Sequence, residues 1–417
     1  MTEIDRTTAG TPSLACHGGV AVRSRAFPPW PHYDEDEIGA VAGVLRSGRV
    51  NYLGGEQGDA FEREFAGFCQ AEYAVALANG TLALELALRA LGVGQGDEVI
   101  VTARSFIASA SCIVMNQAVP VFCDVDADTQ NVTATTLAPL ITPRTRAIIA
   151  VHLAGMPCDM DPIMELADEH GILVVEDCAQ AHGARYRGRP VGGIGHAAAF
   201  SFCQDKIIST GGEGGMLLTS DEQVWHRAWS FKDHGKNREK MLQRGHPPGF
   251  RWLHDSIGSN WRMTEMQAAI GRLQLARLPD WLQRRQRNAE RLRAALQGIP
   301  CLRIPPVPAY ADPAWYKFYL FVRPERLRSG WDRDAILQAV VEEGVPCFTG
   351  SCPEIYREGA FRDGPYCPDH RLPVARRLGE ESLMFPVHPT LADDDMDDMA
   401  RALRKVLAVA GKGGLGG

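Results

Sequence analysis

The residues best suited to chemistry follow short apolar runs along the chain. Lys206 comes after AAFSF (198–202), and Asp177 ends the run ILVVED (172–177). In an open parallel sheet, ligands bind beyond the carboxyl ends of the strands, so these are positions where site residues are expected. A lysine acts as a nucleophile when burial or nearby positive charge leaves its amine partly neutral. A solvated surface lysine is the ordinary interpretation, and an amine nucleophile is favoured only when the other candidate sites agree with it.

Asp177 has two equal interpretations from its position. Aspartate is a good N-cap for a following helix. Alternatively, because a carboxylate at the end of an apolar strand is costly unless it is paired, Asp177 would be a buried anion facing a cofactor cation. A pyridinium nitrogen that must stay protonated is such a cation.

Asn79, Gly80 and Thr81 precede the helical pattern LALELALRALG. A helix start with a glycine and a hydroxyl is suited to bind a phosphate, although an ordinary capped helix has the same residues. The glycines of GGEGG (211–215) and GGIG (192–195) match neither the phosphate loop of nucleotide hydrolases nor the dinucleotide-binding pattern. Nucleotide hydrolysis and a dinucleotide fold are therefore disfavoured.

No metal site is expected. Cys347, Cys352, Cys367 and His370 fall close together, but their spacing matches no common zinc pattern. His152 follows an apolar run and is either a pocket wall or a core histidine. The eleven cysteines never form C-x-x-C, which favours a reducing compartment over a disulfide framework.

Helical periodicity alternates with apolar runs from about residue 57, which predicts an α/β fold with a mainly parallel sheet. The expected strands are 98–102, 120–125, 147–153, 172–177, 198–202 and 215–219. The expected helices between them are 81–92, 106–116 and 160–170.

The second half of the chain is more varied. The basic and glycine-rich stretch 233–262 predicts a long irregular excursion, and 264–298 predicts a long helix that Pro279 kinks. After residue 300, a strand at 315–323 and helices at 333–343 and 392–408 predict a smaller α+β domain.

Composition limits the partners. The 417 residues carry a formal net charge of −7, so no basic field attracts nucleic acid. No apolar run reaches the roughly 18 residues of a membrane-spanning helix. The N-terminal residues lack the order of a secretory signal, and a cytoplasmic location is expected.

Six motifs occur in order along the chain: N-G-T-x-A-L, S-F-x-A-S, D-V-D-x-x-T, E-D-C-A-Q-A-H-G, S-F-x-x-x-K with G-G-E-G-G, and N-W-R-M-T-E-x-Q-A-A-I-G. Together with the C-terminal segment 372–399, they make the chain resemble the DegT/DnrJ/EryC1/StrS family. Members are pyridoxal-phosphate-dependent aminotransferases that act mostly on keto sugars, usually sugar nucleotides. The resemblance implies aminotransferase fold type I, with a large cofactor-binding domain at 20–275 and a small α+β domain at 276–411.

The resemblance also implies catalytic and ring-binding roles. Lys206 would form the Schiff base with pyridoxal 5′-phosphate and then move the proton during transfer. Asp177 would pair with the pyridinium nitrogen, Gln180 would reach the phenolic oxygen, and Phe106 would stack on the ring.

Other matching residues would hold the phosphate, namely Gly80, Thr81 and Ser201. In relatives, an asparagine of the N-x-R-M segment reaches across a dimer interface to the phosphate. Asn260 would therefore serve the partner subunit, and a homodimer with shared active sites follows.

The implied reaction has two halves. An amino acid, glutamate or glutamine, gives its amino group to the cofactor, which becomes pyridoxamine 5′-phosphate, and a keto sugar then accepts it. Such a product serves polysaccharide, glycoconjugate or antibiotic synthesis. A cyclitol ketone of the inosose type is an alternative acceptor, and a non-catalytic cofactor-binding regulator is a weaker alternative. Lys206 argues against the dehydrating branch, which has histidine at this position, and no cysteine stands out as that of a desulfurase.

Two features depart from the family pattern. Many members have histidine in S-F-H-x-x-K where this chain has Cys203, and Asp205 directly precedes the lysine. The loop 232–254 is either a solvated surface or a replacement that meets a diphosphate or carboxylate. Its candidate residues are Lys232, His234, Arg251 and His254.

Overall fold

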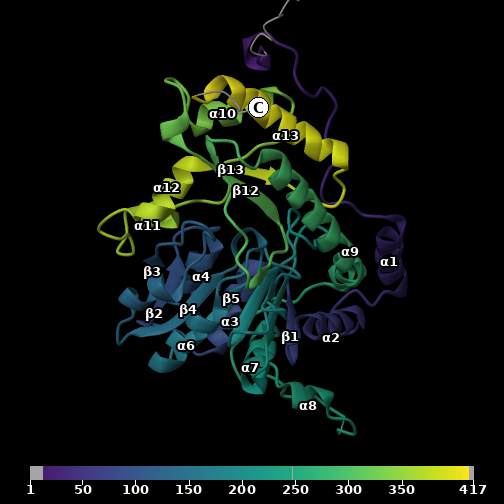
Figure 1. Cartoon of the computed structure of the whole chain (residues 1–417). Coiled ribbons are helices and arrows are strands. Elements are labelled where there is room, and N and C mark those ends of the chain that lie inside the picture. The colour runs from purple at the N-terminus through teal and green to yellow at the C-terminus, as the bar shows by residue number, and fades with distance from the viewer. Residues whose placement is uncertain (1–12, 247, 413–417) are drawn as a thin grey trace, which may run out of the picture.

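A seven-stranded sheet forms the centre of the computed structural model, which describes residues 13–246 and 248–412 (Figure 1). Its strands are β1 (Tyr73–Leu77), β2 (Glu98–Thr102), β3 (Val119–Cys123), β4 (Thr145–Val151), β5 (Leu173–Asp177), β8 (Ala197–Ser201) and β9 (Gly215–Thr219). They lie in the order β1-β9-β8-β5-β4-β2-β3, and only β9 runs antiparallel to its neighbours. The predicted mainly parallel sheet is confirmed, whereas β1 was not predicted.

Helices cover both faces of this sheet because its strands are apolar on both sides. Val99 and Val101 of β2 face one core, and Ile100 between them faces the other. The first core includes α3 (Gly80–Ala90), α4 (Ala108–Met115) and α7 (Glu222–Lys232). The second includes α2 (Gln57–Cys69), α6 (Met160–His170) and α9 (Glu265–Leu296).

The C-terminal part has its own core above the large sheet (Figure 1). There, a three-stranded antiparallel sheet of β10 (Leu302–Arg303), β12 (Lys317–Val322) and β13 (Ser382–Pro386) packs with α10 (Arg333–Glu342) and α13 (Asp393–Ala410). The predicted strand at 315–323 and both predicted helices are present. This part is α+β, as expected.

Helix α9 connects the two parts. Its first half, including Leu275 and Leu278, packs in a core of the large sheet, and Leu292 and Leu296 pack in the C-terminal core. The helix begins at a capping box, in which the Thr264 hydroxyl accepts a hydrogen bond from the Gln267 backbone N–H. The predicted long helix is present, with Pro279 inside it.

The remaining described elements are short or peripheral. They are α1 (Glu35–Ser47), α5 (Ala134–Leu137), α8 (Arg238–Leu242), α11 (Gly359–Arg362), α12 (Pro373–Glu381), β6 (Arg185–Tyr186), β7 (Arg189–Pro190) and β11 (Ala311–Asp312), with the 3-10 turns η1 (Ala15–His17), η2 (Ala138–Leu140), η3 (Leu153–Gly155), η4 (Pro324–Arg326) and η5 (Ile355–Arg357). Helix α8 lies in the predicted excursion and projects from the body of the molecule (Figure 1). Among the described helices, none combines the length and apolar character needed to cross a membrane.

Candidate active site

Lys206 lies in the loop after β8, where the strand exit places it as predicted. The side chain is 16% exposed, and its Nζ lies 3.3 Å from Asp205 Oδ1. The Trp30 indole N–H donates to the Lys206 carbonyl at 2.8 Å. Trp30 packs edge-on against Trp281 of α9, with ring centroids 5.1 Å apart. An N-terminal segment and α9 thus fix the backbone from which the lysine extends.

Asp177, the last residue of β5, is buried and has no ion-pair partner among the described residues. Its carboxylate accepts hydrogen bonds from the Ser109 hydroxyl at 2.7 Å and the Ala179 N–H at 3.1 Å. Burial raises the pKa of Asp177, while these two donors and the charge of Lys206 oppose the rise. A protonated ring nitrogen would supply the missing cation, so this carboxylate fits a pyridinium.

Ser109 was missed as a site residue by sequence reasoning. It lies inside α4, one turn from Ser105, and the two hydroxyl oxygens are 2.9 Å apart. A hydrogen-bonded series therefore runs from Ser105 to Asp177. The S-F-x-A-S motif contains both serines, but Ser105 lies in the bend before α4, so their spacing along the sequence does not show that the two hydroxyls meet.

A cavity of about 410 Å³ opens at Lys206. It brings together three predicted residues, Lys206, Phe106 and Gln180. Phe106 is 65% exposed, so its ring is accessible for a ligand ring to stack on it. Gln180 is buried, and its side-chain oxygen accepts from the Ala154 N–H at 2.7 Å, which leaves its amide N–H groups as donors.

The opposite wall of the cavity comes from the C-terminal part and was not predicted. Its residues are Tyr316, Lys317, Phe348, Gly350, Ser351, Cys352 and Met384. The Tyr316 hydroxyl donates to Asp205. Burial raises the pKa of Asp205, but Lys206 and this hydroxyl outweigh that effect and hold it below its usual range. Asp205 is thus an ionised neighbour of the lysine.

Gly80, Thr81 and Ser201 meet at the start of α3, outside the residues that line the cavity. A Cβ on Gly80 would lie 2.5 Å from Ser201 Cβ, so only glycine permits this approach. Asn79 caps the helix by accepting from the Leu82 N–H at 3.0 Å. Glycine backbone, exposed hydroxyl and helix N-terminus suit a phosphate group.

Asn260 lies apart from the cavity of its own chain. Its side chain is exposed, and its backbone bridges Asp233. Lys232 does not replace the family histidine, because it is fully buried with Nζ 3.7 Å from the centroid of the Tyr52 ring. His234 and His254 are exposed, and none of the four candidates from this loop lines the cavity.

The cysteines and histidine considered for zinc do not come together. In the described chain, no three of Cys347, Cys352, Cys367 and His370 place ligand atoms within 4.8 Å of one another. His152 is a core residue: its Nδ1 accepts from the Cys158 N–H at 3.0 Å, and its Nε2 lies 3.1 Å from Glu176 Oε2. Both ring nitrogens therefore make structural contacts, and these contacts determine the tautomer.

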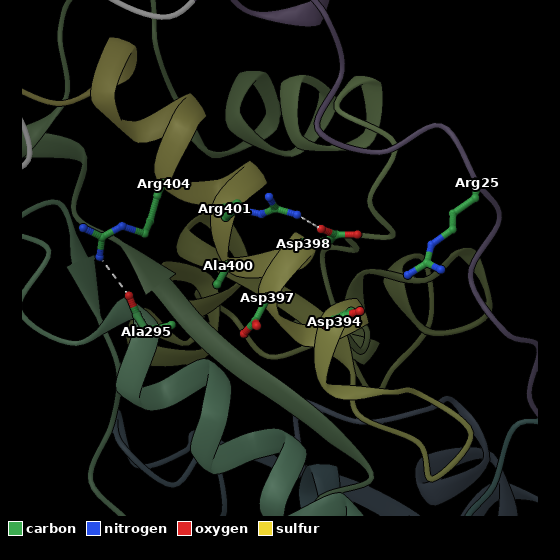
Figure 2. Close-up of a pocket in the computed structure, with 8 residues that line it drawn as sticks. All are labelled: Arg25, Ala295, Asp394, Asp397, Asp398, Ala400, Arg401 and Arg404. Atoms are coloured by element: carbon green, nitrogen blue, oxygen red, sulfur yellow. Dashed lines mark hydrogen bonds and ion pairs between the residues drawn. The ribbon is translucent and has the colours of Figure 1, made fainter. Parts of the chain in front are cut away.

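A larger hollow, of about 700 Å³, lies along α13 and shares no residue with the Lys206 cavity. Figure 2 shows Arg401 joined to Asp398 and Arg404 joined to the Ala295 carbonyl. Its lining contains no amine, thiol or imidazole. It lacks the nucleophile that the Lys206 cavity offers.

The chain is similar to several known proteins. An aminotransferase from Psychrobacter cryohalolentis has a solved structure with a TM-score of 0.89 and 51% identity, over 92% of this chain and 99% of that one. The chain is 37% identical to dTDP-3-amino-3,4,6-trideoxy-alpha-D-glucose transaminase of Streptomyces venezuelae, covering 89% of this chain and 90% of the relative. It is also 37% identical to L-glutamine:2-deoxy-scyllo-inosose aminotransferase of Streptomyces fradiae, over 94% and 97% of the two chains.

These likenesses and the observed sheet confirm aminotransferase fold type I, and the chain is an aminotransferase. A sequence profile of the family matches residues 31–404, almost the whole described chain. The chain therefore belongs to the DegT/DnrJ/EryC1/StrS aminotransferase family.

Proposed function

We propose that the enzyme uses pyridoxal 5′-phosphate to move an amino group from L-glutamate or L-glutamine to the carbonyl of a cyclic keto sugar. One observation carries this proposal: Lys206 enters a cavity beside Phe106 and Gln180, with the unpaired carboxylate of Asp177 buried nearby. When bound, the cofactor supplies an electron-withdrawing ring that stabilises negative charge on the carbon next to the transferred nitrogen.

The chain's own residues do the remaining work. Lys206 binds the cofactor covalently through Nζ and, once released, carries a proton to or from the reacting carbon. Asp177 holds a proton on the ring nitrogen, and Ser109 keeps that carboxylate in place. Asp205 is the anion that faces the lysine when its amine is charged.

Binding and orientation fall to a second group. Phe106 supports one face of the ring, and Gln180 donates an amide N–H to the phenolic oxygen. Gly80, Thr81 and Ser201 hold the phosphate at the N-terminus of α3.

The acceptor is a keto-deoxysugar carried on a nucleotide. The name of the Streptomyces venezuelae relative supports this, because it specifies a dTDP-linked amino sugar. The product would enter polysaccharide, glycoconjugate or antibiotic synthesis. The second candidate acceptor is a cyclitol ketone, which the name of the Streptomyces fradiae relative supports.

The working unit is a homodimer with shared active sites. Asn260 supports this, because it is exposed and away from the cavity of its own chain, free to serve a partner's phosphate. Near it in sequence lie four exposed apolar side chains, Leu242, Phe250, Trp252 and Ile257. The rings of Phe250 and Trp252 contact each other, with centroids 4.7 Å apart. Large exposed apolar patches mark association surfaces in soluble proteins.

The test is a visible absorption spectrum of the purified protein before and after L-glutamate or, separately, L-glutamine. We expect a yellow cofactor band that bleaches with at least one donor and is altered or lost in Lys206→Ala. A bleached wild-type enzyme should then regain colour with the correct keto sugar or cyclitol ketone. Protein that stays colourless after addition of pyridoxal phosphate, or a Lys206→Ala variant with full activity, would refute the proposal.

A further inference from the structure

Lys317 is a second ammonium group in the Lys206 cavity. It is the first residue of β12, so it comes from the C-terminal part, whereas Lys206 comes from the large sheet. Both amines lie over the same tyrosine: Lys206 Nζ is 5.2 Å and Lys317 Nζ is 4.9 Å from the centroid of the Tyr316 ring. The two nitrogens are therefore no more than about 10 Å apart, and an ion held by Lys317 lies in the same cavity as the reacting lysine.

Lys317 has no hydrogen-bond or ion-pair partner among the described residues. The nearby carboxylate of Asp205 is already engaged by Lys206 and by the Tyr316 hydroxyl. Behind the wall lies Arg285, a fully buried cation that donates to the carbonyls of Trp315 and Tyr316. Positive charge thus exceeds negative charge at this end of the cavity.

This arrangement is costly unless an anion completes it. Burial lowers the pKa of Lys317, Arg285 and Lys206 add to this effect, and Asp205 opposes it, so that the pKa lies at about 8. A lysine with a purely structural role is normally paired or extends to water. Lys317 has no such partner among the described residues, is only partly exposed, and lines a ligand cavity.

We propose that Lys317 binds the carboxylate of the amino-acid donor and so holds the donor's amino group at the reacting centre. The inference rests on the proposed function and deepens it. In an amino acid, the α-carboxylate is one carbon from the amino group that reacts, which suits an ammonium next to Lys206. A nucleotide diphosphate is separated from the reacting carbonyl by the sugar ring and does not have this proximity.

The wall that carries Lys317 is well fixed. Tyr319, two residues along β12, accepts at its hydroxyl a hydrogen bond of 2.8 Å from the Ser351 N–H. A Cβ on Gly350 would lie 2.4 Å from the Tyr319 ring, so the loop packs tightly against the strand. The amine is therefore presented by a braced strand end, and its position is set before the donor arrives.

The experiment measures the first half-reaction of the holoenzyme by rapid-mixing absorbance at several donor concentrations. Lys317→Met removes the charge and keeps the length, and Lys317→Arg keeps the charge. Lys412→Met is a matched control far along the chain, where Nζ donates to the Glu325 carbonyl. A charge-assisted contact predicts that Lys317→Met raises the half-saturating L-glutamate concentration about ten- to a hundredfold. The limiting rate should change less than about threefold, Lys317→Arg should restore most of the affinity, and Lys412→Met should match wild type.

Two isomeric donors identify the carboxylate. L-glutamine has an α-carboxylate and a side-chain amide, whereas L-isoglutamine has these groups exchanged. Wild type should favour L-glutamine, and Lys317→Met should lose that preference. The same variant should bind 2-oxoglutarate more weakly in the reverse half-reaction.

Three results would overturn the inference. The first is a half-saturating L-glutamate concentration within twofold of wild type in Lys317→Met. The second is a limiting rate that falls ten- to a hundredfold in Lys317→Met while the half-saturating concentration stays unchanged. The third is weakened inhibition by uridine or thymidine diphosphate with donor affinity unchanged, which would assign Lys317 to the nucleotide. If the wild-type enzyme has no cofactor band at all, the proposed function itself fails.

Discussion

Asp177 illustrates how single residues determine this site. A buried carboxylate without a cation is unfavourable, and hydrogen bonds from Ser109 and Ala179 offset only part of that cost. The same imbalance makes the position selective for a ligand that carries a proton at the facing atom. Stability and function therefore conflict at this residue until the cofactor is bound.

Replacing the carboxylate should slow transfer more than it weakens cofactor binding. We expect Asp177→Asn to lower the rate of the first half-reaction about a hundredfold or more, because a buried pair that loses its charge costs about 3 kcal/mol. Ser109→Ala should cost about tenfold, since it removes one hydrogen bond to a charged group. Ser111→Ala on the same helix is the control, and rapid-mixing absorbance is the measurement. Equal rates in Asp177→Asn and wild type would contradict the assigned role.

The pH dependence of donor binding should report Lys317. Its pKa is lowered to about 8, and only the protonated amine attracts a carboxylate, so the half-saturating L-glutamate concentration should rise as pH increases above about 8. The groups that face Lys317 are Asp205, Lys206, Arg285, Tyr316 and His388. The pKa of His388 is lowered to about 3 by burial and by the charges of Arg285 and Lys317.

The comparison with Lys317→Arg separates this effect from other titrations. A guanidinium stays charged, so the ratio of half-saturating concentrations, wild type to variant, should grow with pH. Titrations common to both proteins cancel in the ratio. A ratio that is constant from pH 7 to 10 would count against a charge on Lys317 as the determinant.

At the scale of elements, the phosphate site depends on how closely a helix end approaches a strand. The start of α3 meets β8 at Gly80 and Ser201, where no side chain fits between them. Gly215 at the start of β9 makes a similar approach, since a Cβ there would lie 2.3 Å from the Asn79 carbonyl oxygen. Backbone packing on two sides therefore fixes the direction of the helix N-terminus.

Gly80→Ala should disturb this element and weaken cofactor binding. The added Cβ must displace Ser201, at a cost of roughly 1–3 kcal/mol, or about fivefold to a hundredfold in affinity. Spectroscopic titration should show the loss for pyridoxal phosphate and little loss for unphosphorylated pyridoxal. Gly43→Ala in α1 has open space around its Cβ and is the matched control. A loss of equal size for both ligands would argue against a phosphate site here.

Local sequence patterns were sufficient for some elements and not for others. Apolar runs located most strands and, through their ends, Lys206 and Asp177. They carry no direction, so the antiparallel course of β9 was not foreseeable. Tyr316 and Lys317 lie more than a hundred residues after Lys206, and only the packing of the two parts brings them to one cavity. Lys232 was misjudged because nothing in its basic surroundings indicates the aromatic pocket of Tyr52.

On the scale of the whole molecule, the exposed apolar side chains of the segment 242–257 bear on the proposed homodimer. Trp252 is 83% and Ile257 92% exposed. Such exposure supports the proposal, in which a second copy would pack there. The chain's net charge of −7 is no obstacle to an apolar contact of this kind.

Introducing a charge at Trp252 should dissociate the proposed dimer. We expect Trp252→Glu to weaken self-association by about 2 kcal/mol or more, roughly thirtyfold in Kd, as large interface aromatics do. Sedimentation velocity is the measurement, and Val341→Glu on α10 is the exposed control. If dimers form and share sites, loss of the dimer should also lower cofactor affinity. A wild-type protein that sediments as a monomer at micromolar concentration would refute the homodimer.

Helix α9 has a further consequence for unfolding and for protein engineering. At 1.5 Å per residue, its 32 residues amount to about 48 Å of helix whose two halves belong to different cores. Neither core can melt alone without cutting or fraying that helix, so heating should produce one cooperative transition. Chimaeras that exchange the C-terminal part with a relative should therefore be joined beyond residue 296. A junction in the middle of the helix would combine two halves whose apolar stripes were selected in different proteins.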